Sequence, residues 1–319
     1  MTNTVQETTT EATTPQLSRV FRIGGELPVR RIGYGAMRLT DSPDAPGGMA
    51  TPIWTAPTDR AEASALLRAA VDLGVNLFDT ADAYALGASE ELIAEALHPR
   101  RDDLVVATKV GVVRPSTTEW VPLGHPAYLR QQAELSLRRL RTDRIDLLYL
   151  HRIDPNVPLA EQVGALAQLQ QEGKVRHIGL SEVTVAELTE ARRTAPIAAV
   201  QNVYNLATRG HEEVVAHTAA EGIAFVPYFP VATGSHARQD GPLAEVAAEL
   251  GATPAQTALA WLLHRAPHVL PIPGTRSVAH LAENAAALEL VLSDEQFARI
   301  ERAAAGDGEA AGDAEAAGQ

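Results

Sequence analysis

The sequence predicts a single (β/α)8 barrel, with a β-hairpin before the barrel and additional helices after it. Three observations predict this fold: the size of the chain, the alternation of eight short apolar segments with helical patterns, and the successive apolar residues within the short segments. The chain has 319 residues, 45% of them hydrophobic, which suits one large α/β domain. Eight β-then-α units in one chain favour a closed parallel barrel.

The candidate strands are apolar on successive residues, as expected for strands buried on both faces of a parallel sheet. They are residues 32–37, 75–79, 104–109, 145–151, 175–180, 199–202, 223–228 and 269–272. A doubly wound sheet is the alternative fold, but it favours a G-x-G-x-x-G turn after the first strand. Gly33 and Gly35 lie within that strand, and no third glycine follows at the required spacing.

Helical patterns between the strands place apolar residues on one face, at residues 58–73, 126–140, 158–172, 184–193, 210–221 and 254–264. Side chains that can cap a helix N-terminus stand at Thr58, Ser89, Thr184, Thr253 and Ser293. Glycines suited to the position after a helix stand at Gly74, Gly173, Gly222 and Gly251.

The two ends of the chain extend the barrel. Residues 21–31 predict a β-hairpin with Gly24 and Gly25 in its turn, placed to close the N-terminal end of the barrel. Helices are expected at 277–289 and 294–304, so the barrel domain is predicted to span residues 19–304. Residues 1–18 and 305–319 are poor in large apolar residues and are predicted to be disordered tails, the second of them acidic.

The composition argues against several classes of protein. The net charge is −13, and an acidic surface disfavours binding to nucleic acid. Cysteine is absent, which excludes disulfides and cysteine-ligated metals, and no metal site is predicted. Because there is no apolar segment of about 18 residues and no secretory signal, we expect a cytoplasmic protein without a membrane span.

Polar residues stand where the buried segments stop. The carboxyl ends of barrel strands lie on one face, so these side chains are expected to converge on one site. Each residue alone has a structural explanation, such as a helix cap or a solvated charge, but their joint placement favours catalysis. They are Asp79, Lys109, His151, Ser181 with Glu182, Gln201 with Asn202, and Tyr228.

The segment from Asn76 to Tyr84, NLFDTADAY, resembles the signature of the aldo-keto reductase family, which has Asp and Tyr five residues apart. Lys109 in ATK and His151 in LYLHR match the other two catalytic positions of that family. The likeness continues through IGLS at 178–181, QN at 201–202, VPYFP at 226–230 and IPGTR at 272–276, and so covers roughly residues 19–302. Within the family, the chain is similar to the pyridoxal-reductase-like bacterial branch.

The resemblance implies that an aldehyde or ketone is reduced to an alcohol by hydride transfer from NADPH, with Tyr84 as general acid. Residue chemistry supports this independently. A tyrosine pKa of about 10 is too high for efficient proton transfer near neutrality, and the Lys109 cation is expected to lower the pKa of Tyr84. Asp79 is expected to hold Lys109 in a buried ion pair, and His151 to hydrogen-bond the carbonyl oxygen.

The resemblance also implies contacts with the nicotinamide end of the cofactor. Ser181 and Gln201 are expected to hold the carboxamide, and Tyr228 to stack on the ring. The family commonly has Asn after the serine, where this chain has Glu182. A carboxylate only accepts hydrogen bonds and cannot reproduce both contacts of an amide, so the alternative for Glu182 is a solvated acid near a helix start.

At the adenosine end, Arg276 is expected to bind a 2′-phosphate, so NADPH is the predicted cofactor. The family often has Arg where this chain has His280, which leaves use of NADH open. His236 and Arg238 are expected near the pyrophosphate. The complete predicted set of cofactor-binding residues is Gly35, Met37, Asp79, Ser181, Gln201, Tyr228, Pro230, Gly274, Thr275, Arg276, His280 and Asn284.

Three long loops, at residues 40–57, 111–125 and 231–241, follow strand ends and are expected to crowd the same face of the barrel. Trp54 and Trp120 lie on two of them. We expect these rings to line an apolar pocket that favours aromatic or extended carbonyl substrates, the alternative being local packing under each loop.

Two other functions fit part of the pattern. Lys109 at a strand end could form a Schiff base, as in an aldolase, although Tyr228 and Arg276 then have no role. A non-catalytic NADP(H)-binding redox sensor or regulatory subunit is the second alternative. The expected partner is a small carbonyl compound, and the resemblance implies a monomer or weak oligomer.

Overall fold

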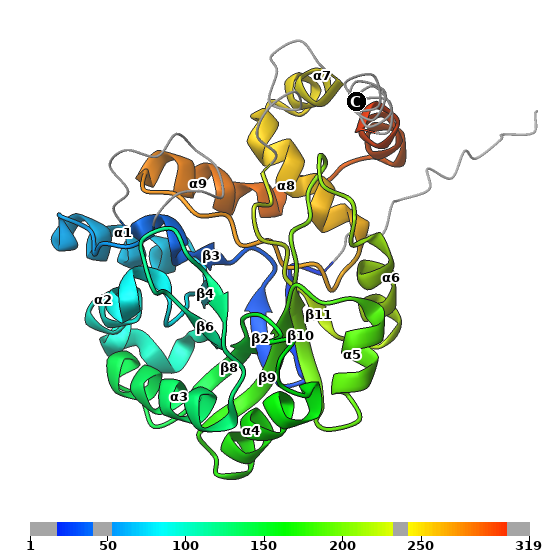
Figure 1. The fold of residues 1–319 in the computed structure, drawn as a ribbon. Coiled ribbons are helices and arrows are strands. Elements are labelled where there is room, and N and C mark those ends of the chain that lie inside the picture. The colour runs from blue at the N-terminus through cyan, green and yellow to red at the C-terminus, as the bar shows by residue number, and fades with distance from the viewer. Residues whose placement is uncertain (1–17, 41–52, 232–241, 305–319) are drawn as a thin grey trace, which may run out of the picture.

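The computed structural model describes residues 18–40, 53–231 and 242–304. Seven parallel strands form one curled sheet, in the order β11-β10-β9-β8-β5-β4-β3 (Figure 1). Their bounds are β3 Tyr34–Gly35, β4 Leu77–Asp79, β5 Val105–Val110, β8 Ile145–Leu150, β9 Val175–Ser181, β10 Ile197–Gln201 and β11 Ala224–Phe225. The predicted tails lie outside the described residues, apart from Ser18.

The eighth predicted strand closes the barrel without pairing as a regular strand. Val269 forms a parallel bridge with Phe225, and Leu270 N donates to Phe225 O at 2.8 Å. On the other side, Gly33 N donates to Pro271 O at 3.0 Å and Gly35 N to Pro273 O at 3.3 Å. The two acceptors, Pro271 and Pro273, have no backbone N–H, so they accept hydrogen bonds but cannot donate one to the neighbouring strand. The predicted (β/α)8 barrel is confirmed, with one irregular seam.

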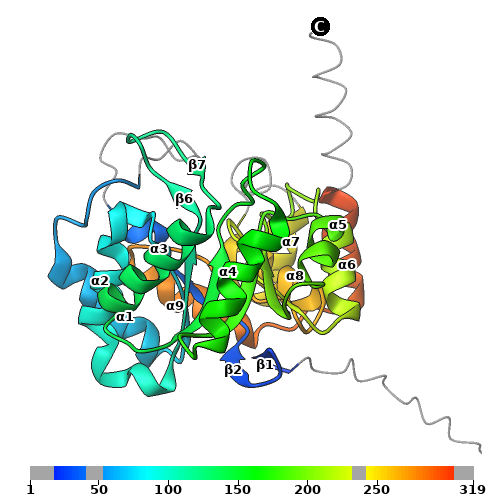
Figure 2. The ribbon, with the colours of Figure 1, turned by 60° about the horizontal axis from the view of Figure 1, so that its bottom comes forward.

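The predicted N-terminal hairpin is formed by β1 (Val20–Ile23) and β2 (Leu27–Arg30), which pair antiparallel. Gly24 and Gly25 both have positive φ, 61° and 75°, in the three-residue connection between the paired residues Ile23 and Leu27, and glycine adopts this backbone region without strain. Ile23 and Val29 are fully buried against residues of the barrel interior. Figure 2 shows the hairpin beneath one end of the barrel, which it plugs.

Helices cover the outer face of the sheet (Figure 1). They are α1 Arg60–Asp72, α2 Ala88–Leu97, α3 Pro126–Leu140, α4 Leu159–Gln171, α5 Val185–Ala191, α6 Glu212–Ala220, α7 Pro242–Leu250, α8 Pro254–Arg265 and α9 Val278–Ala286. Short 3-10 turns stand at η1 Ala36–Leu39, η2 Tyr84–Gly87, η3 His98–Asp103 and η5 Ala287–Glu289. The sequence pattern named no range for α2 or α7, although it placed Gly251 directly after a helix, where α7 ends.

Most predicted helix ends are confirmed. Thr184 and Thr253 form capping boxes at α5 and α8, and Ser293 accepts from Gln296 N at 3.2 Å. Thr58 was expected to cap α1, but Asp59 accepts from Glu62 N there, because it stands one residue closer to the helix. The expected cap at Ser89 is also wrong, since that residue lies inside α2. The four predicted C′ glycines all have positive φ.

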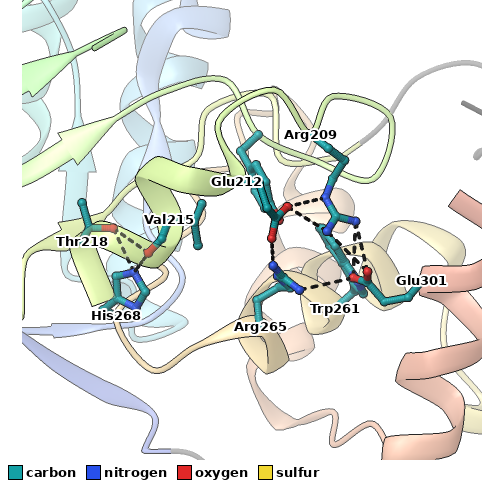
Figure 3. A network of polar contacts seen from close by, with 9 residues as sticks. Arg209, Glu212, Val215, Thr218, Trp261, Arg265, His268 and Glu301 are labelled. Atoms are coloured by element: carbon teal, nitrogen blue, oxygen red, sulfur yellow. Dashed lines mark hydrogen bonds and ion pairs between the residues drawn. The ribbon is translucent and has the colours of Figure 1, made fainter. Parts of the chain in front are cut away.

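A network of charges ties the C-terminal helical residues 294–304 to the barrel (Figure 3). Glu301 accepts from Trp261 Nε1 on α8 at 2.7 Å and pairs with Arg209 at 3.4 Å. Arg209 and Arg265 both pair with Glu212 at the start of α6. The guanidinium of Arg209 also lies over the Trp261 ring, 4.9 Å from its centroid. One glutamate therefore links three separate elements.

Within the described ranges, no helix is long and apolar enough to cross a bilayer. The same residues contain no group of three or more His, Asp or Glu side chains arranged to hold a metal ion.

Candidate active site

Asp79 and Lys109 form an ion pair at the mouth of the barrel. Asp79 ends β4 and Lys109 lies near the end of β5, so pairing of the two parallel strands brings the side chains together. Lys109 Nζ donates to Asp79 Oδ1 at 2.5 Å and to Thr80 O at 2.8 Å, and both side chains are almost wholly buried. The predicted buried ion pair is present, and each charge makes the burial of the other tolerable.

Tyr84 stands beside this pair. Lys109 Nζ lies 3.4 Å from the phenolic oxygen, and the cation sits 5.0 Å from the centroid of the tyrosine ring. The chain turns sharply here, since Ala85 and Leu86 have φ values of 48° and 53°, a region that side chains disfavour. Ala85 N donates to Ile53 O at 3.0 Å, which helps to hold the strained turn.

Burial raises the pKa of Tyr84 above the ordinary tyrosine value, and the charge of Lys109 opposes this rise only in part. The expected net lowering is therefore wrong, because desolvation of the phenolate outweighs the neighbouring cation. Burial alone favours a neutral Lys109, but Asp79 and Tyr84 reverse that effect and raise the pKa of the ammonium. The geometry thus holds a protonated tyrosine against a protonated lysine.

His151 follows β8 and is buried on the same face. Its ring lies edge-on to that of Tyr84, with centroids 6.0 Å apart. Burial, together with the charges of Lys109, Arg152 and Arg114, holds the pKa of His151 well below its usual value. The imidazole is therefore neutral, and its Nδ1 has no hydrogen-bond partner among the described residues. A neutral ring carries one N–H that can donate to a carbonyl oxygen.

Trp120 completes an aromatic group around the tyrosine. Its ring lies edge-on to Tyr84 and to His151, with centroids 6.3 Å and 6.0 Å away. Trp54 is not in this group, but it lies 5.5 Å from the guanidinium carbon of Arg114, which in turn lies 3.7 Å from the Trp120 centroid. Trp120 is thus beside the catalytic candidates, and Trp54 is connected to it through Arg114.

Ser181 and Gln201 lie at the ends of the neighbouring strands β9 and β10 and are buried. Gln201 Nε2 donates to Asp79 Oδ2 at 2.8 Å. The Oε1 atom of Gln201 therefore points away from that carboxylate and can act as an acceptor. Arg152 Nη1 donates to Ser181 Oγ at 3.1 Å, so the serine hydrogen remains available to donate. One donor and one acceptor fit a nicotinamide carboxamide, which offers a carbonyl oxygen and an N–H.

Tyr228, after β11, and Glu182, after β9, contact each other. The Tyr228 hydroxyl hydrogen-bonds to the Glu182 carboxylate, and burial together with this carboxylate raises the pKa of Tyr228. Glu182 Oε1 also accepts from Val203 N at 2.6 Å, and Oε2 lies 3.5 Å from Nε2 of His211. The alternative of a solvated acid near a helix start is therefore wrong, because the carboxylate is held by three neighbours.

Gly35 and Gly274 lie against each other at the closing seam. A Cβ on Gly35 would stand 2.7 Å from Ile272 O, and one on Gly274 would stand 2.6 Å from Gly35 O. The two glycines are therefore required by the close approach of two backbone segments. This packing explains both glycines without reference to the cofactor contact predicted for them, which stays a prediction.

The remaining residues predicted for the adenosine end cluster at the start of α9. Thr275 is buried, and its carbonyl oxygen accepts from Tyr34 at 2.7 Å. Arg276 and His280 are exposed, and Asn284 is half-buried further along the helix. Exposed cationic and polar groups at a helix N-terminus have the chemistry that a phosphate requires.

Two other predicted cofactor residues, Met37 and Pro230, are placed at the rim. Met37 lies in η1 and packs against the cluster containing Tyr84, and Pro230 is buried after β11. His236 and Arg238 lie outside the described residues. Sequence reasoning missed Arg114 and Arg152, which touch the site. The available signal for Arg114 was a charged residue inside a predicted loop, and that for Arg152 was a charged residue directly after His151.

Comparisons with known proteins agree with this geometry. The model of the aldo/keto reductase family matches residues 31–305. Pyridoxine 4-dehydrogenase of Escherichia coli is 43% identical over 290 residues, 89% of this chain and 98% of the relative. An aldo/keto reductase from Klebsiella pneumoniae, solved with NADP and acetate, is 31% identical with a TM-score of 0.75, covering 90% of this chain and 95% of that chain.

A structure of an aldo-keto reductase from Klebsiella pneumoniae in complex with NADPH is also 31% identical, with a TM-score of 0.73, and the match covers 89% of this chain and 94% of that chain. The predicted likeness to the pyridoxal-reductase-like branch is confirmed by the bacterial pyridoxine 4-dehydrogenase. Because the family match spans nearly the whole barrel and the mouth of the barrel holds Asp79, Tyr84, Lys109 and His151 together, the chain belongs to the aldo-keto reductase family of oxidoreductases.

Proposed function

We propose that this protein reduces an aldehyde or ketone to an alcohol, with Tyr84 as the proton donor. The observation that carries the proposal is the buried contact between Tyr84 and Lys109, which Asp79 holds in place. The protein is an NADPH-dependent oxidoreductase, as the family match and the related structures with NADP and NADPH indicate. When bound, the cofactor supplies the hydride.

The chain's own residues supply the proton and the orientation. Neutral His151 donates a hydrogen bond to the carbonyl oxygen, which places that oxygen near the phenol of Tyr84. Tyr84 keeps its proton near neutrality because its pKa is raised, and gives it to the oxygen as negative charge develops there. Lys109 then stabilises the phenolate that remains, since its ammonium is 3.4 Å away.

The predicted residues for the cofactor divide into two groups that fit its two ends. Ser181, Gln201 and Tyr228 hold the nicotinamide, and Arg276 with His280 meets the phosphate of the adenosine end. The mixed donor and acceptor set at Ser181 and Gln201 supports the first assignment. The exposed side chains of Arg276 and His280 at the start of α9 support the second.

The substrate class that we propose is an aromatic aldehyde. Trp120 supplies an apolar ring next to Tyr84 and His151, against which a flat substrate can pack. The relative named pyridoxine 4-dehydrogenase acts on an aromatic alcohol, whose oxidised form is an aromatic aldehyde. Pyridoxal and benzaldehyde are therefore the first compounds to assay.

A Schiff-base enzyme is disfavoured by the state of Lys109. Its ammonium donates to Asp79 and to Thr80 O, and its pKa is raised, so the amine is not available as a nucleophile. A non-catalytic sensor would bind NADPH without consuming it, and the assay below separates that outcome from catalysis.

The test is NADPH consumption with a panel of aldehydes and ketones, comparing wild type with Tyr84→Phe. Because general acid catalysis contributes about 10²–10⁴ in rate, kcat is expected to fall at least about a hundredfold. NADPH binding, followed by fluorescence titration, is expected to stay nearly unchanged. Tyr128→Phe is the matched control, because the Tyr128 hydroxyl donates to Val112 O, at 3.3 Å, and has no role in the proposed reaction. Wild-type turnover in Tyr84→Phe would overturn the mechanism.

A further inference from the structure

Arg114 is a buried cation at the mouth of the barrel that the mechanism above does not use. It follows β6 (Val112–Val113), which pairs with β7 (Val121–Pro122) in the hairpin above the site (Figure 2). Only 8% of the residue is exposed. A charge in such a place is costly unless its surroundings satisfy it, so its contacts carry information.

The guanidinium donates to main-chain carbonyls of three separate segments. Nε donates to Glu119 O at 2.9 Å and Nη2 to Thr117 O at 2.7 Å, which fixes the loop of its own hairpin. Nη1 lies 3.5 Å from Ile53 O and from Ala83 O. Ala83 directly precedes Tyr84, and Ile53 O also accepts from Ala85 N, so Arg114 joins the loops to the turn that carries the tyrosine.

The same cation contacts both loop tryptophans. Its central carbon lies 3.7 Å from the centroid of the Trp120 ring and 5.5 Å from that of Trp54, distances at which a cation is attracted to the face of an indole. Trp120 in turn lies edge-on to Tyr84 and His151. The orientation of Trp120 beside the reacting groups is therefore fixed from behind by Arg114.

We propose that Arg114 is a positioning residue that makes the site selective for flat aromatic carbonyl compounds, by holding Trp120 as a rigid wall beside Tyr84 and His151. The inference rests on the proposed carbonyl reduction at this site. A rigid wall favours substrates whose ring packs on it, because little side-chain freedom is lost on binding. A small aliphatic aldehyde does not reach the wall, so its reduction depends only on Tyr84, Lys109 and His151.

Arginine is required for this arrangement because of its shape. Its planar group sends N–H bonds in several directions at once while presenting a flat face to an indole. Lysine keeps the charge, but its three N–H bonds all sit on one nitrogen, so it cannot reach three separate segments in the same way. Charge alone therefore does not restore the wall.

The experiment compares kcat/KM for benzaldehyde with kcat/KM for propanal, both with NADPH, in wild type, Arg114→Met and Arg114→Lys. We expect kcat/KM for benzaldehyde to fall about tenfold in both variants, mainly through KM, and that for propanal to change less than about threefold. Trp120→Leu is expected to lose the same preference for benzaldehyde over propanal. In the double variant, Arg114→Met is expected to have little further effect, because the ring that it positions is already absent. Arg130→Met, which removes a half-buried arginine paired with Glu172 at 2.7 Å, away from the site, is the matched control and keeps the wild-type ratio.

An unchanged ratio of the two kcat/KM values in folded Arg114→Met, with wild type active, overturns the inference and leaves the proposed function standing. Equal losses for both aldehydes overturn it too, since they indicate general damage to the site. If Arg114→Met does not fold, Arg114→Lys and Trp120→Leu decide the question by the same ratio. A wild type that reduces no carbonyl compound removes the proposed function, and this inference with it.

Discussion

Residues with positive φ stand in three of the segments that follow strands at the mouth of the barrel. Each directly follows a residue of the candidate site: Ala85 follows Tyr84, Glu182 follows Ser181, and Phe229 follows Tyr228. Holding a side chain in this backbone region costs on the order of 1–3 kcal/mol per residue, so the surrounding contacts must enforce it. At Glu182 those contacts are visible, because its carboxylate is anchored to Val203 N and to the Tyr228 hydroxyl.

Glu182 is expected to set the position of the Tyr228 ring. In Glu182→Gln an amide oxygen replaces a carboxylate that accepts from both Val203 N and Tyr228, so at least one charge-assisted hydrogen bond is weakened. We predict that the Kd for NADPH rises by about three- to tenfold, with a smaller change in kcat, as measured by fluorescence titration and steady-state kinetics. Glu190→Gln, an exposed position on α5, is the control. Equal effects of the two substitutions would count against this role.

At the scale of elements, Glu301 is a partner shared by several groups in the attachment of the C-terminal helical residues 294–304. Glu301 accepts from the Trp261 indole at 2.7 Å and pairs with Arg209 and Arg265, which also share Glu212 (Figure 3). Charges shared in a partly buried network contribute more than isolated surface pairs do. Stacking of Phe297 on Trp261, with centroids 6.5 Å apart, adds apolar contact to the same attachment.

Removing the shared partner is expected to loosen this element. In Glu301→Ala the buried indole N–H and two guanidinium groups lose an acceptor, so the free energy of unfolding should fall by about 1–3 kcal/mol. Urea unfolding followed by circular dichroism measures the change. Glu249→Ala removes the partner of Arg299 in an exposed pair, at 2.7 Å, and should cost less than about 1 kcal/mol. Equal losses in the two variants would mean that the network acts as an ordinary surface pair.

For the whole molecule, stability depends on pH through buried histidines. His268, on the closing segment of the barrel, is buried between Val215 O and the Thr218 hydroxyl, with Nε2 3.1 Å from each oxygen. Burial lowers the pKa of His268 from 6.5 to about 4. Between these values the unfolded chain binds the proton and the folded chain does not, so the free energy of unfolding falls as the pH falls.

The acid sensitivity should therefore be reduced in His268→Gln. One pKa unit corresponds to about 1.4 kcal/mol, so this histidine alone should account for about 2 kcal/mol of the difference between unfolding at pH 7 and at pH 5. Urea unfolding at both pH values measures that difference and separates it from any constant loss in the variant. His280→Gln, at an exposed position, should leave the difference unchanged. If His268→Gln shows the full wild-type difference, other groups cause the acid sensitivity.

Local patterns were sufficient wherever a single segment carried the information. Helix α3 has the predicted bounds, the hairpin turn lies at Gly24 and Gly25, and the capping box at Thr253 is present, because each depends on neighbours within a few residues. The eighth strand was predicted at the right place, but its irregular pairing depends on which carbonyls face Gly33 and Gly35. That register is a property of the closed sheet.

The sequence by itself determined the barrel, the family and the four catalytic candidates. The alternation of strand and helix segments and the spacing from Asp79 to Tyr84 are patterns among residues that are close together in the chain. Only the tertiary structure decided how charge and burial balance at the site. It showed that desolvation outweighs Lys109 in setting the pKa of Tyr84. It also showed that Arg114 lies against Trp120 and that Glu182 faces Tyr228. These outcomes depend on contacts between distant segments, whose distances and solvent exclusion exist only once the barrel has closed.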